Sequence, residues 1–473
     1  MKLYLLVLSA ACRLSLQCQT PTVSLELKGE TAASMQSTPQ KIVPDENGKP
    51  YFYLAAKAGG LQVYDIQNPA QPLLKKTVSI AQLSGLEVMN AAQRGNFLYL
   101  ALGNFFGNDG QAPGLAILDV TDPLNPVLKD TWIWDTVDKG SASVTISGDY
   151  AYLCAMTQGL FILNIADPGN IVFESKYVPD PNFPVPNPSA IHIPNARGVA
   201  VRNEVAYLCY DAGGLRIIDV SDVENPVETG HYANPAMGDK PQAFNNIALN
   251  GDFAYVAVDY CGMEVLNISD TANIQQVAWW NPWQCQSPAN IWVGSPGHTN
   301  QIAFDTASQL VFMSSAQSEL SIVNVSVPTQ PLLAGSYGTV DNQLGTWGVT
   351  LDGNRVFLTY ITAVIPFVST WAGIKILEWE QISGTGEAPL SGTGKVFPNP
   401  FSDRFDVDFY LEHKSELKIE IFNPNGILVE KLAGSTFEPG KHVLAFESTL
   451  PSGVYILHIE AGDVSFYKKL VKI

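Results

Sequence analysis

The sequence has few basic residues and no long hydrophobic run. Lys and Arg together number 27 against 45 Asp and Glu, so the formal net charge at pH 7 is −18. Such a chain repels a phosphate backbone, which argues against a nucleic acid as its partner. Beyond the N-terminal segment, no stretch has the run of about 18 apolar residues that a membrane-spanning helix requires. We therefore expect neither a nucleic-acid partner nor a transmembrane span.

Recognisable catalytic and metal-binding motifs are missing as well. The sequence has no G-x-S-x-G elbow, no H-E-x-x-H pair and no phosphate-binding loop. None of the six Cys belongs to a C-x-x-C pair, which argues against a zinc knuckle or a redox motif. Gly107–Gly110 (G-N-D-G) matches only a fragment of a calcium loop. We predict a protein that is not an enzyme and holds no metal or other cofactor.

The N-terminus reads M-K-L-Y-L-L-V-L-S-A-A-C-R, one Lys followed by a short apolar run and small residues. This pattern is typical of a secretory signal peptide, which we assign to residues 1–18. Lipoprotein processing before Cys12 is the alternative. Export would carry the chain into a compartment where disulfides form.

One short phrase recurs about every 50 residues, which indicates a repeat architecture. Its clearest copy is Leu215–Val220 (L-R-I-I-D-V), and altered copies begin at Leu61, Leu115, Leu160, Met263, Leu320 and Ile374. Short apolar runs surround each copy, separated by Gly, Asp, Asn and Pro, as is typical of strands joined by turns. Four strands in each of seven repeats predict an all-β, seven-bladed β-propeller over residues 19–381. An open β-solenoid is the alternative.

The Asp of the phrase is the residue that most resembles a catalytic group. It is followed by a turn such as S-D-V-E-N-P or T-D-P-L-N-P. An Asp at the end of a strand commonly accepts hydrogen bonds from the turn that follows. We therefore expect Asp65, Asp119 and Asp219 to stabilise turns.

The seventh repeat has no fourth strand of its own, and a segment with the composition of a flexible linker follows at 382–395. Thr22–Lys28 precedes the first repeat and alternates as a strand does. We predict that this N-terminal strand is the outer strand of the seventh blade. It would close the propeller and cover two sheet edges.

The phrase resembles the LVIVD repeat, most closely at Leu115–Pro126, which reads L-A-I-L-D-V-T-D-P-L-N-P. The resemblance covers about residues 39–379 and departs from the pattern near its end, where Glu378-Trp379 replaces Asp-Val. It implies a propeller in an exported bacterial protein, and it implies architecture more than activity.

From residue 396 the repeat stops, and about seven short apolar runs follow, as in a small β-sandwich. The runs carry P-N-P-F, N-P-N-G-I-L-V, S-G-V-Y-I-L-H-I and a basic K-K-L-V-K-I ending. With these motifs, residues 396–473 resemble the type A C-terminal sorting domain of type IX secretion substrates in Bacteroidota. The matching positions are Pro398, Asn399, Pro400, Gly426, Gly453, Tyr455, Lys468 and Lys469.

This second resemblance implies contact with the type IX secretion machinery and passage through the outer membrane. The protein would then be either released or attached to the cell surface. A carbohydrate-binding sandwich is the alternative, although the tail has no Trp to form a sugar platform.

Loop lengths differ between the two faces of the predicted propeller. Connections between second and third strands, and those between blades, share one face. The long, divergent segments nearly all fall there: 101–113, 176–197, 233–245, 279–300 and 361–372. Loop elaboration on one face of a repeat protein marks the candidate binding face.

Aromatic and polar residues of that face form the candidate site. The aromatic candidates are Trp283, Trp292 and Trp347, which would stack on sugar rings or anchor a protein. The polar candidates around the axial opening are His192, Arg197, Asn245, His298 and Asn300. Packing of the rings beneath the long loops is the alternative.

The same face carries two Cys, Cys261 and Cys285, which are the candidate disulfide; Cys154 and Cys209 occupy matching strand positions and are expected to be buried thiols. We expect a module that binds a protein or a glycan. One alternative is a glycan lyase or hydrolase at the axial opening, which would need convergent carboxylates or His there. A purely structural surface-layer component is the other.

Overall fold

The computed structural model describes residues 23–33, 38–106, 110–189, 192–238, 240–382, 395–411, 414–423, 428–461 and 464–473. The predicted signal peptide, most of the predicted linker and Gly426 lie outside the described residues. The described chain divides into two compact units, one of which spans Val23–Gln381. Among the described residues, no helix is long and apolar enough to cross a membrane.

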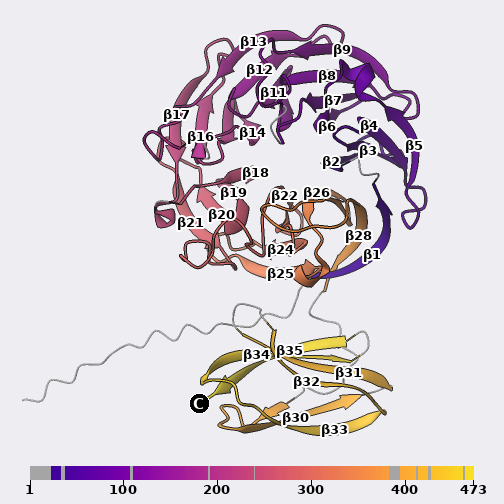
Figure 1. Cartoon of the computed structure of the whole chain (residues 1–473), viewed down its shortest axis with the longest axis vertical. Coiled ribbons are helices and arrows are strands. Elements are labelled where there is room, and N and C mark those ends of the chain that lie inside the picture. The colour runs from indigo at the N-terminus through magenta and orange to yellow at the C-terminus, as the bar shows by residue number, and fades with distance from the viewer. Residues whose placement is uncertain are drawn as a thin grey trace, which may run out of the picture. The chain divides into compact units, whose positions relative to one another are not determined.

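The unit that spans Val23–Gln381 consists of four-stranded antiparallel sheets, and each sheet corresponds to one repeat (Figure 1). The first three are β2 (Lys41–Pro44), β3 (Tyr51–Ala55), β4 (Leu61–Asp65) and β5 (Leu73–Val78); β6 (Val88–Arg94), β7 (Phe97–Leu102), β8 (Gly114–Asp119) and β9 (Val127–Ile133); and β10 (Ser143–Ser147), β11 (Tyr150–Cys154), β12 (Leu160–Asn164) and β13 (Val172–Tyr177).

The next three sheets are β14 (Gly198–Arg202), β15 (Val205–Cys209), β16 (Leu215–Asp219) and β17 (Val227–Tyr232); β18 (Phe244–Asn250), β19 (Phe253–Val258), β20 (Gly262–Asn267) and β21 (Gln275–Trp280); and β22 (Ile302–Asp305), β23 (Leu310–Ser314), β24 (Leu320–Asn324) and β25 (Leu332–Tyr337). Short 3-10 helices lie in the connections: η1 (Ile80–Leu83), η3 (Pro235–Met237), η4 (Asp259–Cys261) and η5 (Val340–Asn342).

The last sheet joins the two ends of this unit. It contains β26 (Thr346–Asp352), β27 (Arg355–Tyr360) and β28 (Gly373–Gln381), with β1 (Val23–Ala32) as its outer strand. β1 pairs antiparallel with β28 along its length, from the pair Val23 and Gln381 to the pair Ala32 and Gly373. The N-terminal strand therefore occupies the outer position that the sequence predicted, and it extends to Ala32 rather than ending at Lys28.

The phrase forms the third strand of each sheet, and both sides of this strand are buried. In β16, Ile217 packs with residues of the β18–β21 sheet, and Ile218 packs with residues of the β10–β13 sheet. A strand buried on both sides is apolar at successive positions rather than at alternate ones. This explains why the phrase is a nearly continuous hydrophobic run.

The Asp of the phrase accepts a hydrogen bond from the turn, as predicted. Asp65, Asp119 and Asp219 each accept from the backbone N–H two residues ahead, all at 2.9 Å. The backbone bond from Thr121 lowers the pKa of Asp119, and the side-chain bond from Ser221 lowers that of Asp219. These carboxylates therefore stabilise turns.

Residues from the two ends of the repeat region also meet. The first strands of neighbouring repeats contact one another in chain order, from β2 through β6, β10, β14, β18 and β22 to β26. The last of them, β26, also contacts β2. At that junction Thr350 Oγ1 donates to the Ile42 carbonyl at 2.8 Å, and Lys41 Nζ donates to the Val349 carbonyl at 3.1 Å. In Figure 1 the sheets follow one another around a circle.

The C-terminal unit has two packed sheets. One contains β29 (Lys395–Phe397), β30 (Arg404–Leu411) and β33 (Gly440–Glu447); the other contains β32 (Leu428–Phe437), β31 (Ser415–Phe422), β34 (Gly453–Ala461) and β35 (Val464–Lys472). Phe405 of β30, Ile419 of β31 and Leu457 of β34 belong to one buried apolar cluster. This arrangement is a small β-sandwich, as the spacing of apolar runs predicted.

A chain that begins at Thr38 lacks β1 and leaves β28 as an exposed edge. We expect its midpoint of thermal unfolding to fall by several degrees, because it loses the β1 ladder and the burial of Val23 against Trp379. We also expect light scattering to rise with concentration, because unpaired strand edges associate. The control begins at Val23, and equal midpoints for the two chains would contradict the prediction.

Candidate functional site

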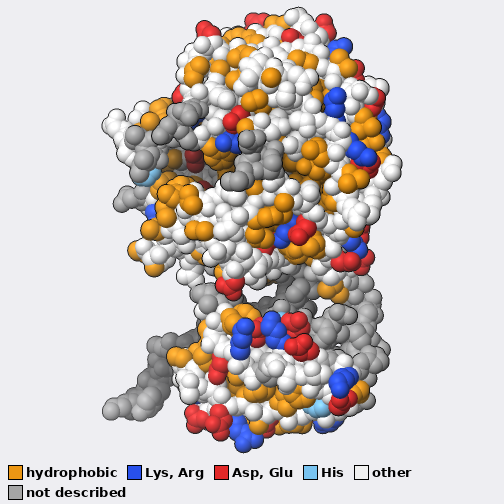
Figure 2. All heavy atoms as spheres, turned by 45° about the vertical axis from the view of Figure 1, so that its right-hand side comes forward, with side chains coloured by type: hydrophobic (Ala, Val, Ile, Leu, Met, Phe, Trp, Pro, Cys, Tyr) orange, Lys and Arg blue, Asp and Glu red, His pale blue; other side chains and the backbone are white. Residues whose placement is uncertain are grey.

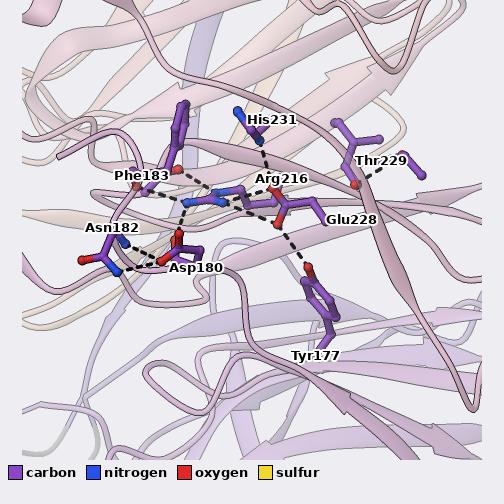
Figure 3. Close-up of polar contacts among 10 residues, drawn as sticks. Tyr177, Asp180, Asn182, Phe183, Arg216, Glu228, Thr229 and His231 are labelled. Atoms are coloured by element: carbon purple, nitrogen blue, oxygen red, sulfur yellow. Dashed lines mark hydrogen bonds and ion pairs between the residues drawn. The ribbon is translucent and has the colours of Figure 1, made fainter. Parts of the chain in front are cut away.

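A buried polar side chain at the second position of the phrase holds a long loop in place. In β16 this residue is Arg216, whose side chain is 1% exposed. Its Nη2 donates to the carbonyls of Asp180 at 2.8 Å and Phe183 at 3.1 Å, and its Nη1 pairs with Glu228 at 3.1 Å (Figure 3). The guanidinium also lies 4.8 Å from the centre of the Phe183 ring. Arg216 thus fixes the loop after β13 onto the sheet.

Two further sheets use the same position in this way. Glu264 of β20 is fully buried and accepts from Tyr232 Oη, Asn234 Nδ2 and Gln276 Nε2 at 2.8–3.0 Å. Burial raises its pKa to about 7, although the three donors oppose the shift. Glu264 thereby holds the start of the loop that leads to η3.

In the last sheet the residue is Lys375, which pairs with the fully buried Glu319 at 3.1 Å. Glu319 also accepts from Asn342 Nδ2 at 2.8 Å and from Tyr360 Oη at 2.7 Å. Because Asn342 lies in η5, this buried ion pair fixes the loop between β25 and β26.

Residues in or next to four sheets form one cluster of rings and polar groups. Arg197 Nη2 donates to Asn300 Oδ1 at 3.2 Å, and Asn300 Nδ2 donates to the Trp347 carbonyl at 2.8 Å. The Arg197 guanidinium lies 4.9 Å from the Phe105 ring centre and 5.9 Å from that of Trp347. Phe106 meets Trp347 edge-on at 5.0 Å. We call these five residues the four-sheet cluster.

The sequence placed Arg197, Asn300 and Trp347 around one opening, and the structure brings these three together. Phe105 and Phe106 belong to a predicted long loop but were not candidate site residues. Their rings, like Arg197 and Trp347, are only partly buried. The cluster therefore leaves parts of a guanidinium and of three aromatic rings accessible to a ligand.

The other candidates bond or pack with other residues, and Asn245 does so beside the cluster, next to Asn300. Asn245 is buried and donates to the Thr299 carbonyl at 3.1 Å. His192 bonds Ser189 at 3.2 Å and helps to line a small pocket beside Phe183. Trp283 is half-buried, and a Cβ on Gly297 would lie only 2.0 Å from its ring. Trp283 therefore packs the loop, as the alternative interpretation expected of these rings.

His298 and Trp292 share a carboxylate that sequence reasoning missed. His298 is 4% exposed, and its Nδ1 lies 2.6 Å from Asp259 Oδ1. Trp292 Nε1 donates to Asp259 Oδ2 at 3.0 Å. In the described part of the chain, His298 Nε2 has no hydrogen-bond partner. Asp259 thus links two loop residues to η4.

Asp211 is a second carboxylate that the sequence did not single out. It lies three residues before the Gly that precedes the phrase, as Asp259 does in the next sheet. The same position in other repeats is Lys57 and Met156. Lys57, Met156 and Asp211 have φ of 52°, 49° and 46° and bridge to the next sheet. Such left-handed backbone is uncommon for residues other than glycine.

Asp211 is held rather than free. Asn195 Nδ2 donates to its Oδ2 at 3.2 Å, and desolvation raises its pKa. The recurring position was the signal that would have identified both carboxylates.

Cys261 and Cys285 are joined by a disulfide, and Cys154 and Cys209 are buried free thiols. Trp279 Nε1 donates to the Cys261 carbonyl at 2.9 Å. The disulfide ties the loop after β21 to η4.

The tail residues lie mostly at one end of the sandwich. Asn399 Nδ2 donates to the Lys469 carbonyl at 2.6 Å, and its Oδ1 accepts from the Val471 N–H at 2.8 Å. Pro398 and Pro400, on either side of it, follow cis peptide bonds, and Lys468 precedes Lys469 in β35. The P-N-P-F motif is thus bonded to the last strand of the chain.

Two further sorting-motif residues belong to β34. Gly453 is its first residue, and Tyr455 Oη donates to the Pro451 carbonyl at 2.8 Å.

Family models match both parts of the chain. The model described as the LVIVD repeat matches residues 48–79, 87–132, 139–178, 194–234, 243–278 and 312–339. The model described as the secretion system C-terminal sorting domain matches residues 395–473. The chain is an LVIVD-repeat protein with a C-terminal sorting domain. The copy of the phrase at Ile374, which departs from the pattern, lies outside the six matched segments.

No curated protein matches this LVIVD-repeat chain. Among solved structures, "Structure of U3-55K" is similar, with 11% identity, a TM-score of 0.52 and coverage of 74% of this chain and 98% of that one. The crystal structure of the computationally designed Ika8 protein has 11% identity, a TM-score of 0.45 and coverage of 75% and 100%. At 11% identity, the similarity to the U3-55K structure concerns the fold alone.

Arg216→Met keeps much of the apolar stem and removes the hydrogen bonds. We expect cleavage within residues 178–189 by a low-specificity protease to become several-fold faster, because this segment loses both of its carbonyl contacts with the sheet. Limited proteolysis with mass spectrometry measures the sites. Arg202→Met, which removes a bond to the Gly251 carbonyl in a short turn, is the control. Equal cleavage rates in the two variants would argue against the anchor.

Reduction of the Cys261–Cys285 disulfide removes a crosslink between residues 24 apart. We expect the free energy of unfolding of the double variant Cys261→Ser, Cys285→Ser to fall by about 3 kcal/mol, since the crosslink restricts the unfolded chain. Denaturant unfolding with and without reductant measures the change. A wild-type protein that is insensitive to reductant would contradict it.

Proposed function

We propose that residues 23–381 form a closed, seven-bladed β-propeller that serves as a non-enzymatic binding module for a protein or a glycan. The closure rests on the last sheet. Its β26 contacts β2, its β28 pairs with the N-terminal strand, and its Phe357 packs with Phe52 of β3 at 5.7 Å between ring centres. A closed ring covers the sheet sides that a linear array leaves exposed at its two ends.

The observation that carries the binding proposal is the four-sheet cluster. It gathers Phe105, Arg197 and Trp347 from distant parts of the chain, and these side chains remain partly exposed. Aromatic side chains and Arg are the groups that contribute most at binding interfaces. Buried polar anchors hold the surrounding loops, so the surface is organised before a ligand arrives.

The ligand that fits this face is neutral or carries isolated charges. In the view of Figure 2, acidic and basic side chains are interspersed over the molecule rather than gathered into one basic area. The net charge of −18 also disfavours a polyanion. A glycan or an uncharged protein surface would meet neither obstacle.

A glycan lyase or hydrolase is the second candidate, and Asp211 and Asp259 are the carboxylates it would use. Desolvation raises the pKa of Asp211, which would suit a general acid. However, Asp259 is bonded to His298 and Trp292, and Asp211 to Asn195. Asp259 uses both of its oxygens in these bonds and Asp211 uses one, so we rank binding above catalysis.

The C-terminal sorting domain indicates export by type IX secretion to the cell surface or the medium. Under the proposal, the segment 1–18 is a signal peptide that directs the first crossing, and the tail engages the secretion machinery. The Cys261–Cys285 disulfide suits an oxidising location.

The binding proposal is tested on a glycan array and a protein array probed with the wild-type chain. For a hit, Arg197→Gln and Trp347→Ala should each weaken binding by about tenfold or more, the usual cost of truncating a central interface residue. Phe173→Ala changes an exposed ring on the outer strand β13 and should bind as wild type does. No hit on either array, or equal binding by all three variants, would refute the proposal.

A further inference from the structure

One position of the first strand recurs in each sheet of the repeat unit, and most of its occupants are polar. It pairs with a small residue of the second strand, such as Ala55 opposite Lys41. The polar occupants are Lys41, Asn90, Ser143, Asn246 and Gln301. The other two are Gly198 and Gly348. We call these residues the polar ring.

The polar ring lies where the first strands meet. These strands contact one another from β2 to β26, β26 contacts β2, and they lie on the inner side of the circle of sheets (Figure 1). Hydrogen bonds join neighbouring first strands at this level. Ser143 Oγ donates to the Arg197 carbonyl at 2.7 Å, and Lys41 Nζ donates to the Val349 carbonyl at 3.1 Å. The ring residues therefore form one layer around the space that these strands surround.

Lys41 is the charged member of the ring, and the described residues give it no carboxylate partner. The buried Arg216 and Lys375, in contrast, are each paired with a Glu. Desolvation lowers the pKa of the Lys41 ammonium to about 8, so the group remains mostly protonated at neutral pH. An ammonium has three N–H donors, and Lys41 uses one of them on a carbonyl. A desolvated cation without a counter-ion is a favourable place for an anion.

The ring also contains an acceptor that needs a donor. Gln301 is 7% exposed, and within the described part of the chain its Oε1 has no hydrogen-bond partner. This oxygen faces the next ring member, since a Cβ on Gly348 would lie 3.2 Å from it. A buried acceptor without a donor costs stability, and a ligand hydroxyl supplies the missing bond. The ring thus calls for a ligand with both a negative charge and hydroxyl groups.

The ring adjoins the four-sheet cluster. Arg197, Asn300 and Trp347 of the cluster each come immediately before a ring residue in the sequence. The cluster is partly exposed, whereas Gln301 and Asn90 of the ring are buried. A ligand held by the cluster therefore lies next to the ring. The aromatic rings of the cluster offer flat faces to a sugar.

We infer that the polar ring binds the carboxylate of a sugar acid, with Lys41 as its counter-ion and Gln301 accepting from a hydroxyl group. This inference deepens the proposed binding function, and it rests on the closed ring of sheets proposed there. A single carboxylate finds a local cation in Lys41 and a second one in Arg197. A polyanion would still be repelled by the acidic chain as a whole.

Isothermal titration calorimetry of the full chain tests the inference with D-glucuronate and D-galacturonate. Their neutral parents, glucose and galactose, lack the carboxylate, and acetate lacks the sugar hydroxyls. We expect at least one uronate to bind about tenfold or more tightly than its parent, because the parent loses a charged hydrogen bond. Acetate should bind about fivefold more weakly than that uronate.

Lys41→Met should weaken uronate binding by about tenfold or more, because it removes the counter-ion and keeps the aliphatic stem. Its thermal midpoint without ligand should be no lower than that of the wild type, because the variant has no desolvated charge at this position. The matched control is Lys75→Met, on the outer strand of the same sheet, where Lys75 is paired with Asp65 at 3.7 Å. This control should bind as the wild type does.

The inference is overturned if neither uronate binds the wild type, or if the neutral parents or acetate bind as tightly as the uronates. Unchanged uronate binding by Lys41→Met would overturn it as well. Array hits that depend on Trp347 but not on Lys41 would overturn it and leave the proposed function standing. Uronate binding that is lost in Lys41→Met and kept in Trp347→Ala would support the site in the ring and contradict the proposed role of the cluster.

Discussion

The constraint on which the rest of the structure depends is that the third strand of each sheet is apolar on both sides. Ile217 packs against one neighbouring sheet and Ile218 against the other. A sheet standing alone would leave both sides of this strand in water, so no repeat is stable without a neighbour on each side. The junction between the first and last sheets, where Phe52 and Tyr64 pack with Phe357 and Ile376, follows from the same requirement.

The same strand also organises the loops. Its second residue is buried near the start of the strand, and there a polar side chain finds loop partners. This position is occupied by two basic residues, Arg216 and Lys375, and by one acidic residue, Glu264. A buried ionisable group is tolerated only when it is paired with an opposite charge or well hydrogen-bonded, so each of these residues requires its particular partners. Loop conformation is thereby coupled to the core.

Much of the fold was predictable from local patterns. The recurring apolar runs and turns predicted the four-stranded sheets, and the position of Asp219 before S-D-V predicted its role in the turn. The outer position of the N-terminal strand followed from the missing fourth strand of the last repeat. The site was less predictable. Arg197 and Trp347 were expected near one opening, but Asp211 and Asp259 were missed, because their shared position lies just outside the phrase.

By itself, the sequence determined the all-β class, the repeat spacing, the turn carboxylates and the sorting tail, because each depends on residues close together in the chain. Only the tertiary structure decided which side chains meet across sheets. The contact of Arg197 with Asn300 joins residues 103 positions apart, and no local pattern encodes such a distance. The sequences of the long loops do not repeat, so their conformations depend on packing against neighbouring sheets. The surface available to a partner depends on the same packing.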